Sequence, residues 1–549
     1  MGVPVTTALV PTASPESPFP DRGHGPYRIL RLFLGRAVRV FDASITDPQA
    51  AQARRLARIL ENGVGTAFFA DHGLTGAESM AELREKVPVR KHIEMLPYLD
   101  RVEAGERGVL ALGEVRHLVE TSGTTGRPKH LPVNEPWIRS CDIAQRLWML
   151  GLLRDDEGLA GGRALSVISP AEHSRSAGGI PIGSNTGRMF LDQPWWTRMR
   201  AAVPYAVCSI PDPEVRAYTL LRHALGKDIR SWTTANPSTI LLYCRKLGVF
   251  WDDLRQDAAD GTLRRGPAAG LDPADRRRLA RGLGRVRLGE NPHPASIWPL
   301  RRINCWTGGS AKFFLAKLPA ALGRDIPVRE VGIHASEGVF AVSVDDGDPV
   351  LWLGGHVLEL RDDAGAILDP TEAEVGREYE LVVTTESGLW RYAMGDLVRV
   401  TGWLGRAPRV VFVRKSGSFL NATGEKVTEG QVLAATQRVH GHATGVCAAT
   451  EWSDPPRIVL WVERAPDDGW RFDASHFDAA LQEENLEYAS KRQTGRLAET
   501  HVVDLPAGTF ARWRTERVAA GAPEAQVKDP VVVEFDAFSR FLGVRSGRD

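Results

Sequence analysis

Helical and strand-like patterns of hydrophobic residues follow one another along this chain. Residues 47–62 have apolar side chains at the i, i+3 and i+4 spacing of an amphipathic helix, with Asp47 as the N-cap and Gly63 as the stop. The same spacing predicts a second helix at residues 135–153. Short apolar runs predict buried strands at residues 113–120, 163–169, 301–309 and 326–336. This alternation of strands and helices predicts an α/β fold with layered sheets.

The pattern changes after residue 347. From there to residue 415, short strand-like runs alternate with turn residues, which predicts a β-rich subdomain. The polar, glycine-bearing run that follows has the composition of a hinge. We therefore expect a disordered leader at residues 1–25, a large N-terminal domain at residues 26–415, a hinge at residues 416–424 and a small mobile α/β domain at residues 425–549.

Length and composition indicate a multidomain globular protein. A chain of 549 residues is too long for one ordinary core, and 43% hydrophobic with 25% charged residues is typical of soluble domains. The 69 basic and 68 acidic side chains give a net charge of +1, which argues against nucleic acid or a membrane as a main partner. Residues 272–287 carry arginines without interleaved aromatic residues, so we expect a solvated basic helix there and not an RNA-binding patch.

The lack of a recognisable targeting signal and the pattern of the cysteines favour a cytoplasmic protein. We take a monomer as the default state. The N-terminus lacks a basic n-region and is interrupted by prolines, and no apolar run approaches the roughly 18–20 residues of a membrane span. A loose myristoylation pattern, Gly2 with Thr6, is interpreted as a coincidence because nothing else indicates a membrane. The five cysteines are scattered and form no CxxC pair, so neither a disulfide framework nor a zinc site is expected.

Residues 120–133, ETSGTTGRPKHLPV, gather hydroxyl side chains, glycines and a lysine directly after a predicted strand. The hydroxyl groups can donate hydrogen bonds, the glycines let the backbone approach a ligand, and Lys129 adds a point charge. The groups in question are Thr121, Ser122, Thr124, Thr125, Gly123 and Gly126. Together they suit phosphate oxygens. A surface turn rich in small polar residues would have a similar composition, but the strand, loop and lysine in one register favour phosphate.

The spacing of this loop differs from that of a Walker loop, which has four residues between its glycines and a Ser or Thr after its lysine. Pro128 also prevents a direct passage into a helix. We therefore expect a mobile loop that closes over the β- and γ-phosphates of ATP.

This loop and several segments downstream of it resemble motifs of the adenylate-forming enzymes. The sequence most closely resembles the acyl acid amido synthetases, which include the auxin- and jasmonate-conjugating enzymes of plants and their bacterial relatives. The resemblance runs from about residue 52 to residue 530. It is carried by VETSGTTGRPKHLPV, TANPSTILLYCRKL, HASEG, YELVVTTESGLWRYAMGDLVRVTG, FVRKSGSFLNATGEKVTEGQV and AQVKDP. It implies a large N-terminal adenylate-forming domain, with layered sheets and a β-rich subdomain, followed by a small mobile C-terminal α/β domain.

Residue roles follow from the resemblance, position by position. Residues 121–126 and Lys129 would bind the phosphates, Glu337 would help to hold Mg²⁺, and Asp396 would accept both ribose hydroxyls. The remaining nucleotide-binding residues would be Thr307, Gly308, Gly309 and Ser310 against the adenine, Ser336, and Arg414 at the ribose or phosphate. Lys528 would meet the α-phosphate or the substrate carboxylate.

Several of these residues can also be interpreted as parts of the fold that bind no ligand. Asp396 follows Gly395, and a Gly-Asp pair commonly forms a turn. Glu337 is compatible with a helix start, and Lys528 with a solvated lysine near a terminus. The sequence also departs from the family pattern, with Ile333 in place of a tyrosine, Ala393 in place of an arginine and Ser416 in place of the hinge aspartate.

The implied activity is ATP-dependent amide synthesis through an acyl-adenylate, with ATP and Mg²⁺ as cofactors. A carboxylic acid would displace pyrophosphate from ATP, and an amine would then displace AMP from the acyl group. Rotation of the C-terminal domain would serve the two half-reactions in turn. Amide formation in secondary metabolism, such as antibiotic assembly, is one setting for such a ligase, and amino acid conjugation is another.

The acyl pocket is expected in residues 169–184, where a glycine-rich backbone precedes several aromatic residues. Its members would be His173, Gly178, Gly179 and Ile180, with walls from Phe190, Trp195, Trp196 and Tyr205. An aryl or other hydrophobic acid would fit such walls, and His173 would orient the acid or deprotonate the amine. Packing in the core explains any single aromatic equally well, and a lone histidine is often structural.

Two alternatives remain open at this point. An acyl-CoA ligase would share the first half-reaction, and the nucleotide motifs do not specify the acceptor. A non-catalytic nucleotide-binding regulator on the same scaffold would retain the fold, although Lys129, Glu337 and Asp396 together favour catalysis.

Overall fold

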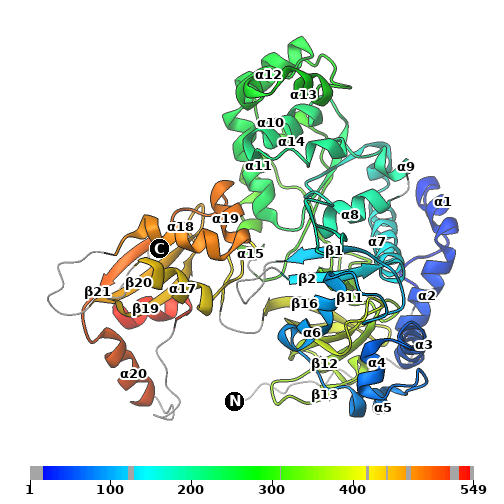
Figure 1. The fold of residues 1–549 in the computed structure, drawn as a ribbon. Helices are drawn as coiled ribbons and strands as arrows, with labels where there is room; N and C mark the ends of the chain where they lie inside the picture. Colours follow the sequence, from blue (N-terminus) through cyan, green and yellow to red (C-terminus); the bar gives the residue numbers. More distant parts are fainter. Residues whose placement is uncertain are drawn as a thin grey trace, which may run out of the picture. The chain divides into compact units, whose positions relative to one another are not determined.

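The computed structural model describes residues 16–121, 129–193, 195–309, 311–415, 419–439, 443–464, 472–519 and 531–543 (Figure 1). The chain divides into two compact units. Unit 1 comprises Met1–Thr121 and His130–Ser416, and unit 2 comprises Ser122–Lys129 and Gly417–Asp549. Across the described ranges, every helix is too short or too polar to span a bilayer.

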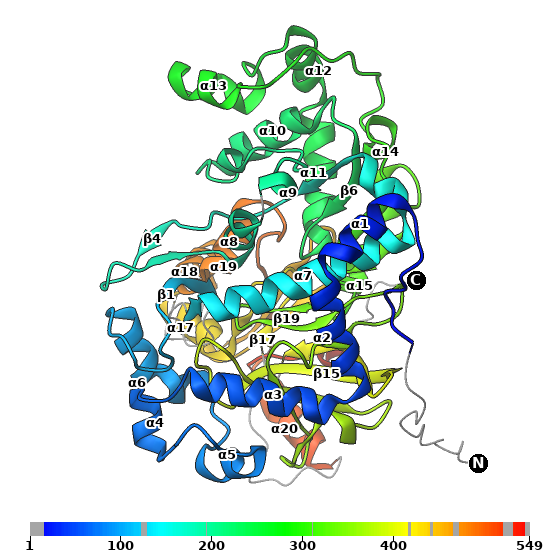
Figure 2. The same ribbon diagram turned by 90° about the vertical axis from the view of Figure 1, so that its right-hand side faces the viewer.

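The N-terminal part of unit 1 is helical, and its helices α1 to α3 run along the side of the long helix α7 and the large sheet (Figure 2). The helix predicted at residues 47–62 is confirmed as α3, and the Asp47 carboxylate accepts a hydrogen bond from the Ala50 amide at 3.1 Å. The helices are α1 (Gly25–Phe33), α2 (Gly35–Thr46), α3 (Pro48–Glu61), α4 (Ala67–His72), α5 (Met80–Lys86) and α6 (His92–Glu103).

A four-stranded sheet in the order β2-β1-β5-β4 follows these helices. It consists of β1 (Val115–Thr121), β2 (Lys129–Asn134), β4 (Ser174–Arg175) and β5 (Pro181–Gly183). β1 runs parallel to β5, with Leu118 opposite Ile182. Helix α7 (Glu135–Asp155) begins directly after β2, where the Asn134 side chain accepts a hydrogen bond from the Trp137 amide at 3.0 Å. The strand predicted at residues 113–120 and the helix predicted at 135–153 are thus confirmed.

A second sheet is parallel and has the order β3-β6-β7-β8. Its strands are β3 (Arg163–Ser166), β6 (Ile229–Thr233), β7 (Arg302–Cys305) and β8 (Val328–Glu330). Helices between and after them are α8 (Asn185–Asp192), α9 (Trp195–Arg198), α10 (Pro213–Ala224), α11 (Pro237–Val249), α12 (Trp251–Asp260), α13 (Pro273–Leu279), α14 (Pro294–Ile297), α15 (Ala311–Leu315) and α16 (Leu318–Leu322). The basic helix expected at 272–287 is shorter than predicted, because Gly282 has φ +79° and ends the helical path soon after Leu279.

The β-rich subdomain is confirmed as one eight-stranded sheet in the order β13-β12-β14-β15-β16-β11-β10-β9. Its strands are β9 (Ile333–His334), β10 (Val339–Val342), β11 (Val350–Leu351), β12 (Val357–Arg361), β13 (Ile367–Leu368), β14 (Glu378–Thr384), β15 (Tyr392–Leu404) and β16 (Ala407–Lys415). The single strand predicted at residues 326–336 is instead two strands, β8 and β9, in different sheets. Gly332 separates them with φ +99°, and a Cβ there would lie 2.2 Å from the Ala341 carbonyl oxygen.

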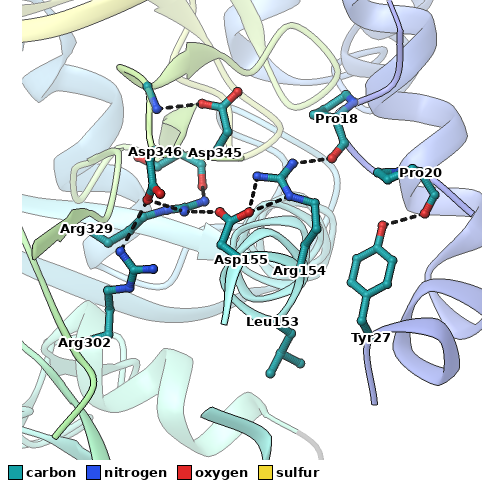
Figure 3. Close-up of polar contacts among 12 residues, drawn as sticks. Pro18, Pro20, Tyr27, Leu153, Arg154, Asp155, Arg302, Arg329, Asp345 and Asp346 are labelled. Carbon is teal, nitrogen blue, oxygen red and sulfur yellow. Dashed lines mark hydrogen bonds and ion pairs between the residues drawn. The ribbon is translucent and has the colours of Figure 1, made fainter. Parts of the chain in front are cut away.

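A buried polar network joins the end of α7 to β8 and to the turn after β10 (Figure 3). Arg329 of β8 is almost fully buried and contacts Asp155 at 2.5 Å and Asp346 at 2.9 Å. Arg302 of β7 approaches Asp346 at 3.4 Å. Because a buried guanidinium needs carboxylate and carbonyl partners, this network fixes the parallel sheet against the α7 layer.

Unit 2 contains a three-stranded sheet in the order β19-β20-β21 and a two-stranded sheet of β17 and β18. Its elements are β17 (Phe419–Leu420), β18 (Val427–Thr428), α17 (Glu429–Val439), β19 (Ala443–Glu451), β20 (Arg457–Arg464), α18 (Ala474–Glu484), α19 (Leu486–Gln493), β21 (His501–Leu505), α20 (Thr509–Ala519) and α21 (Phe535–Leu542). Leu420 and Ala422, within the expected hinge, are buried in the core of this unit. The buried Glu425 carboxylate holds the same segment by accepting hydrogen bonds from the amides of Ala422 and Thr423 at 2.6 and 2.8 Å.

Candidate functional site

The β15–β16 hairpin places Asp396 directly opposite Lys415. Its turn lies between Leu404 and Ala407, which are paired across the strands. Two register shifts interrupt the hairpin; one adds a residue to β16 and the other adds a residue to β15, so their effects cancel. Asp396 and Lys415 are therefore paired as a direct count outward from the turn would pair them.

Asp396 and Lys415 form a nearly buried ion pair, with 2.5 Å between Oδ1 and Nζ. The Lys415 ammonium also donates to the Met394 carbonyl at 3.2 Å. Burial alone would lower the pKa of Lys415, but the carboxylates of Asp396 and Glu337 outweigh it and raise this pKa above its usual value. Lys415 is therefore a fixed cation at neutral pH.

Glu380 holds the backbone just before Asp396. Its carboxylate accepts a hydrogen bond from the Gly395 amide at 3.0 Å and is paired with Arg361. Gly395 has φ +75°, a conformation that glycine adopts without strain. The Asp396 carboxylate is thus presented from a braced strand and not from a free turn.

Glu337 lies at the tip of the turn between β9 and β10, where the Ala335 amide donates to the Gly338 carbonyl at 2.9 Å. The Glu337 side chain is buried, and its backbone carbonyl accepts a hydrogen bond from the Trp137 indole of α7 at 2.7 Å. Burial, followed by the charges of Glu337 and Asp396, raises the pKa of Tyr392 well above its usual value. Glu337 and Asp396 thus act on the same two groups, the Lys415 ammonium and the Tyr392 hydroxyl.

The segment after β7 packs on the backbone of β16. A Cβ at Gly308 would lie 2.5 Å from the Phe412 carbonyl oxygen, and Gly309 has φ +57°, so both positions require glycine. Thr307 is fixed by the Glu330 carboxylate, which accepts its amide at 2.6 Å and its hydroxyl at 2.7 Å. Burial raises the pKa of Glu330 in spite of these hydrogen bonds. Thr307–Gly309 therefore lie a few residues along β16 from Lys415.

A second group of charged side chains lies at the end of β1 and the start of β2. Glu120 contacts His130 at 3.3 Å and His173 at 3.4 Å, and His130 also contacts Glu103 at 3.0 Å. The hydrogen bond to Glu120, opposed by burial and assisted by Glu103, raises the pKa of His130. The His173 imidazole is exposed. Lys129 is the first residue of β2 and directly precedes His130.

The glycines of residues 169–184 have clear packing roles. Gly178 and Gly179 form the turn between β4 and β5, and Gly179 has φ +78°. A Cβ at Gly178 would lie 2.3 Å from the amide nitrogen of Gly105, so the turn approaches the end of α6 with no room for a side chain. Ile180 is partly buried against the main core.

Several predicted site residues lie outside the described part of the chain, namely residues 122–128, Ser310, Ser416 and Lys528, and nothing is described of the side chains of Thr121 and Trp196. Of the others, Asp396 is paired with Lys415, the charge of Glu337 acts on the same lysine, and Gly308 and Gly309 pack against Phe412 and Val413 of β16. Ser336 precedes Glu337 in the β9–β10 turn. Arg414 is exposed, and its neighbour Lys415 faces Asp396. Adjacent strand residues point to opposite faces, which separates Arg414 from the Asp396 side of the sheet.

Sequence reasoning missed three charged residues of this site, Lys415, Glu330 and Glu120. One signal was available for Lys415: Gly405–Arg406 lies between two strand-like runs and predicts a two-residue hairpin. Counting outward from that turn pairs Asp396 with Lys415. No comparable local signal identifies Glu330 or Glu120, because their partners come from distant segments.

Three of the predicted aromatic residues line a cavity of about 470 Å³ in unit 1, namely Phe190, Trp195 and Tyr205. The residues lining this cavity do not include His173 or the Gly178–Ile180 turn. The single acyl pocket predicted from the aromatic residues and the glycine-rich turn stays a prediction.

Comparison with known families matches three consecutive segments of the chain. Residues 37–328 match the GH3 family N-terminal domain, residues 356–415 the GH3 family central domain, and residues 431–537 the GH3 family C-terminal domain. The end of the second match coincides with Lys415, the last residue of β16.

Curated relatives match over nearly their whole length. An indole-3-acetic acid-amido synthetase of Oryza sativa subsp. indica is 26% identical, with 92% of each chain covered. A jasmonoyl-L-amino acid synthetase of Nicotiana attenuata is 24% identical, covering 90% of this chain and 93% of the relative.

Two solved structures have the same fold. The GH3.15 acyl acid amido synthetase superimposes with a TM-score of 0.63 at 19% identity, covering 93% of this chain and 95% of that chain. A 2-hydroxyisobutyryl-CoA ligase gives a TM-score of 0.54 at 14% identity, covering 90% of this chain and 92% of that one. The predicted fold class, a large N-terminal adenylate-forming domain with a C-terminal α/β domain, is confirmed.

Proposed function

This chain belongs to the GH3 family, and from that premise we propose that it is an ATP-dependent acid–amine ligase. It would adenylate a hydrophobic or aryl carboxylic acid and transfer the acyl group to the amine of an amino acid, releasing AMP and pyrophosphate. The family membership and the amido synthetase relatives support this proposal. The observation that carries it is the nearly buried ion pair of Asp396 and Lys415, with the charge of a second buried carboxylate, Glu337, helping to raise the pKa of Lys415. Buried charges grouped in this way are common at functional sites.

The groups around Asp396 fit a nucleotide. Oδ1 takes the Lys415 ammonium, and no described residue donates a hydrogen bond to Oδ2, so one carboxylate oxygen is left for a ribose diol. The missing side chains of Gly308 and Gly309 let this segment pack directly against Phe412 and Val413 of β16, where the adenine would lie against its backbone. Lys129 and the hydroxyl-rich loop would then bind the phosphates.

Glu337 is our candidate for holding Mg²⁺. Within the described ranges, no group of three or more His, Cys, Asp or Glu side chains is arranged to hold a metal ion. A single carboxylate fits Mg²⁺, which usually takes one or two carboxylates and completes its shell with phosphate oxygens and water. When bound, the ion would neutralise charge on the departing pyrophosphate.

The chemistry divides between the two groups of side chains. The substrate carboxylate attacks the α-phosphorus of ATP and pyrophosphate leaves; Lys129 and the loop donors would stabilise the charge that develops there. The amine then attacks the acyl carbon and AMP leaves with the C–O bond electrons. The amine reaches the site as an ammonium ion and must lose a proton first. His173 is exposed and held by Glu120, which suits it to accept that proton.

Isotope exchange between pyrophosphate and ATP, measured across a panel of carboxylic acids, tests the first half-reaction. We expect exchange only with hydrophobic or aryl acids, and trapping by hydroxylamine as the acyl hydroxamate. Asp396→Asn should reduce exchange by about 10²-fold or more, because it removes the charged acceptor for the ribose. Lys312→Met, at an exposed lysine of the same unit, is the matched control and should leave exchange unchanged. The absence of acid-dependent exchange in the wild-type protein would refute adenylation.

The second half-reaction is tested by offering amino acids and coenzyme A separately to the enzyme in the presence of ATP and an accepted acid. We expect mass spectrometry to detect an N-acyl amino acid and no thioester. If the acyl-CoA alone were formed, the acceptor would be a thiol and not an amine, while the proposed adenylation step would still hold.

A further inference from the structure

The cavity next to α8 and α9 combines apolar walls with a basic rim. It has a volume of about 470 Å³, within the range of about 300–1,000 Å³ that accommodates small organic ligands. Phe190 and Tyr205 are stacked, with 5.9 Å between ring centroids and 18° between planes. Trp195 and Met199 contribute exposed apolar surface, each more than 60% accessible.

The charged residues that line this cavity are all cationic: Arg163, Arg198, Lys227 and Arg281, with no aspartate or glutamate among the lining residues. Arg163 forms part of the wall and donates to the carbonyls of Met199 and Ala201 at 2.6 and 3.2 Å. Within the described ranges no carboxylate forms an ion pair with Arg198, Lys227 or Arg281. The nearby carboxylates of Asp192 and Asp228 are already paired with arginines outside the cavity lining.

The pKa values of two neighbouring side chains, Arg200 and His223, are lowered by burial and by nearby positive charges. Burial and the charges of Arg163 and Arg230 lower the pKa of Arg200. His223 lines the cavity, and burial, opposed by its hydrogen bond to the Leu279 carbonyl, lowers its pKa with further contributions from Arg222 and Lys227. Arg198 and Arg281 are exposed and Lys227 is partly exposed, so a bound anion would gain charge contacts at the rim while its apolar part contacts the walls.

We propose that this cavity binds a small amphipathic carboxylate, with its aromatic or acyl body against Phe190, Trp195 and Tyr205 and its charge beside Arg198, Lys227 and Arg281. This inference rests on the cavity itself and not on the adenylation chemistry. Two sources would supply such a ligand if the proposed function holds: the free acid and its N-acyl amino acid conjugate. Tyr205 also accepts a hydrogen bond from the Ala171 amide at 2.7 Å, so a ligand here contacts a residue fixed to the 169–184 segment.

Fluorescence titration with 1-anilinonaphthalene-8-sulfonate, compared with its neutral analogue N-phenyl-1-naphthylamine, tests the proposal without ATP. At low ionic strength, Arg198→Glu/Arg281→Glu should weaken binding of the sulfonate by about tenfold, because two exposed charge contacts are reversed. Binding of the neutral analogue should change by less than about twofold. Arg277→Glu, at an exposed arginine of α13 that does not line the cavity, is the matched control.

Competition then identifies the source of the carboxylate. Displacement of the sulfonate probe by 1-naphthylacetate assigns the cavity to the free acid, and displacement by N-(1-naphthylacetyl)aspartate assigns it to the conjugate. Lys129→Ala should retain this binding while losing pyrophosphate exchange, which separates failure of the two proposals. Three results would each overturn the inference. They are failure of both compounds to displace the sulfonate probe, an equal loss of binding of both probes in the double variant, and an equal weakening of sulfonate binding by Arg277→Glu.

Discussion

Replacement of Lys415 by methionine keeps the length of the side chain and removes the only cation paired with Asp396 in the described residues. The ion pair is largely buried, with 17% of the Lys415 side chain and 7% of the Asp396 side chain exposed. Removing one partner of a buried pair costs about 3–5 kcal/mol, because the other charge is left unpaired. Since Lys415 retains some exposure, we expect the lower end of this range, about 3 kcal/mol.

The reciprocal change should cost less. In Asp396→Asn, Lys415 keeps the favourable charge of Glu337 and its hydrogen bond to the Met394 carbonyl, so the expected loss is about 1–2 kcal/mol. The double variant Asp396→Asn/Lys415→Met should lose less than the sum of the single variants, because it leaves no unpaired partner in this pair.

Urea unfolding at pH 7.5, followed by far-ultraviolet circular dichroism, measures these differences. With a denaturant slope of roughly 3 kcal/mol/M, Lys415→Met should lower the midpoint by about 1 M. Lys312→Met provides the matched control, as an exposed lysine in the same unit. A midpoint for Lys415→Met within error of the wild type, or strict additivity in the double variant, would refute the electrostatic account of this site.

The same pair predicts the direction of an alkaline effect. The pKa of Lys415 is raised above 10.5 in the folded state, so its contribution to stability is complete below pH 10.5 and is lost as the pH rises through the folded pKa. The stability difference between wild type and Lys415→Met should therefore shrink above that pH. A difference that grows with pH would have the wrong sign for this mechanism.

Three further predictions concern the ends of β1 and β2 and the turn that packs against α6. Lys129→Ala should reduce pyrophosphate exchange by about 10²–10³-fold with little change in thermal stability, and unchanged exchange would exclude Lys129 from the site. Gly178→Ala places a Cβ 2.3 Å from the Gly105 amide and should destabilise the protein by about 2 kcal/mol or more in urea unfolding, unless the turn shifts without cost. His130 has a raised pKa, so its pairing with Glu120 stabilises the protein below about pH 6.5 and is lost as the pH rises through the folded pKa. The stability advantage of wild type over His130→Gln should therefore be larger at pH 6 than at pH 9, and a constant advantage would contradict it.

Local sequence patterns were sufficient for many of the elements. The Asp47 cap and the apolar spacing after it specify α3, and the same kind of pattern specifies α7, because helix caps and the helical period involve only neighbouring residues. The hydrophobic patterns were less reliable where one continuous apolar run contains strands of two different sheets. Residues 326–336 have a continuous strand-like pattern, and only the positive φ of Gly332 and its contact with Ala341 show where β8 ends and β9 begins.

The site was predictable in part for the same reason. Asp396 and Glu337 were found because each belongs to a short motif, but the motif that contains Arg414 and Lys415 does not show which of the two faces Asp396. Side chains alternate across a strand, and each bulge shifts the register by one residue. A count outward from the Gly405–Arg406 turn pairs Asp396 with Lys415 only because the two bulges of the hairpin cancel, which the sequence does not show.

The sequence by itself determined the family, the alternation of strands and helices in α/β layers, and the residue types that suit a nucleotide, since all of these depend on neighbouring residues. Only the tertiary structure decided that Glu330 accepts hydrogen bonds from Thr307 and that Glu120 meets His130 and His173, and it showed that the bulges leave Asp396 opposite Lys415. The physical reason is that ion pairs and cavities depend on distances between segments remote in the chain, which packing and strand register set and no local pattern encodes.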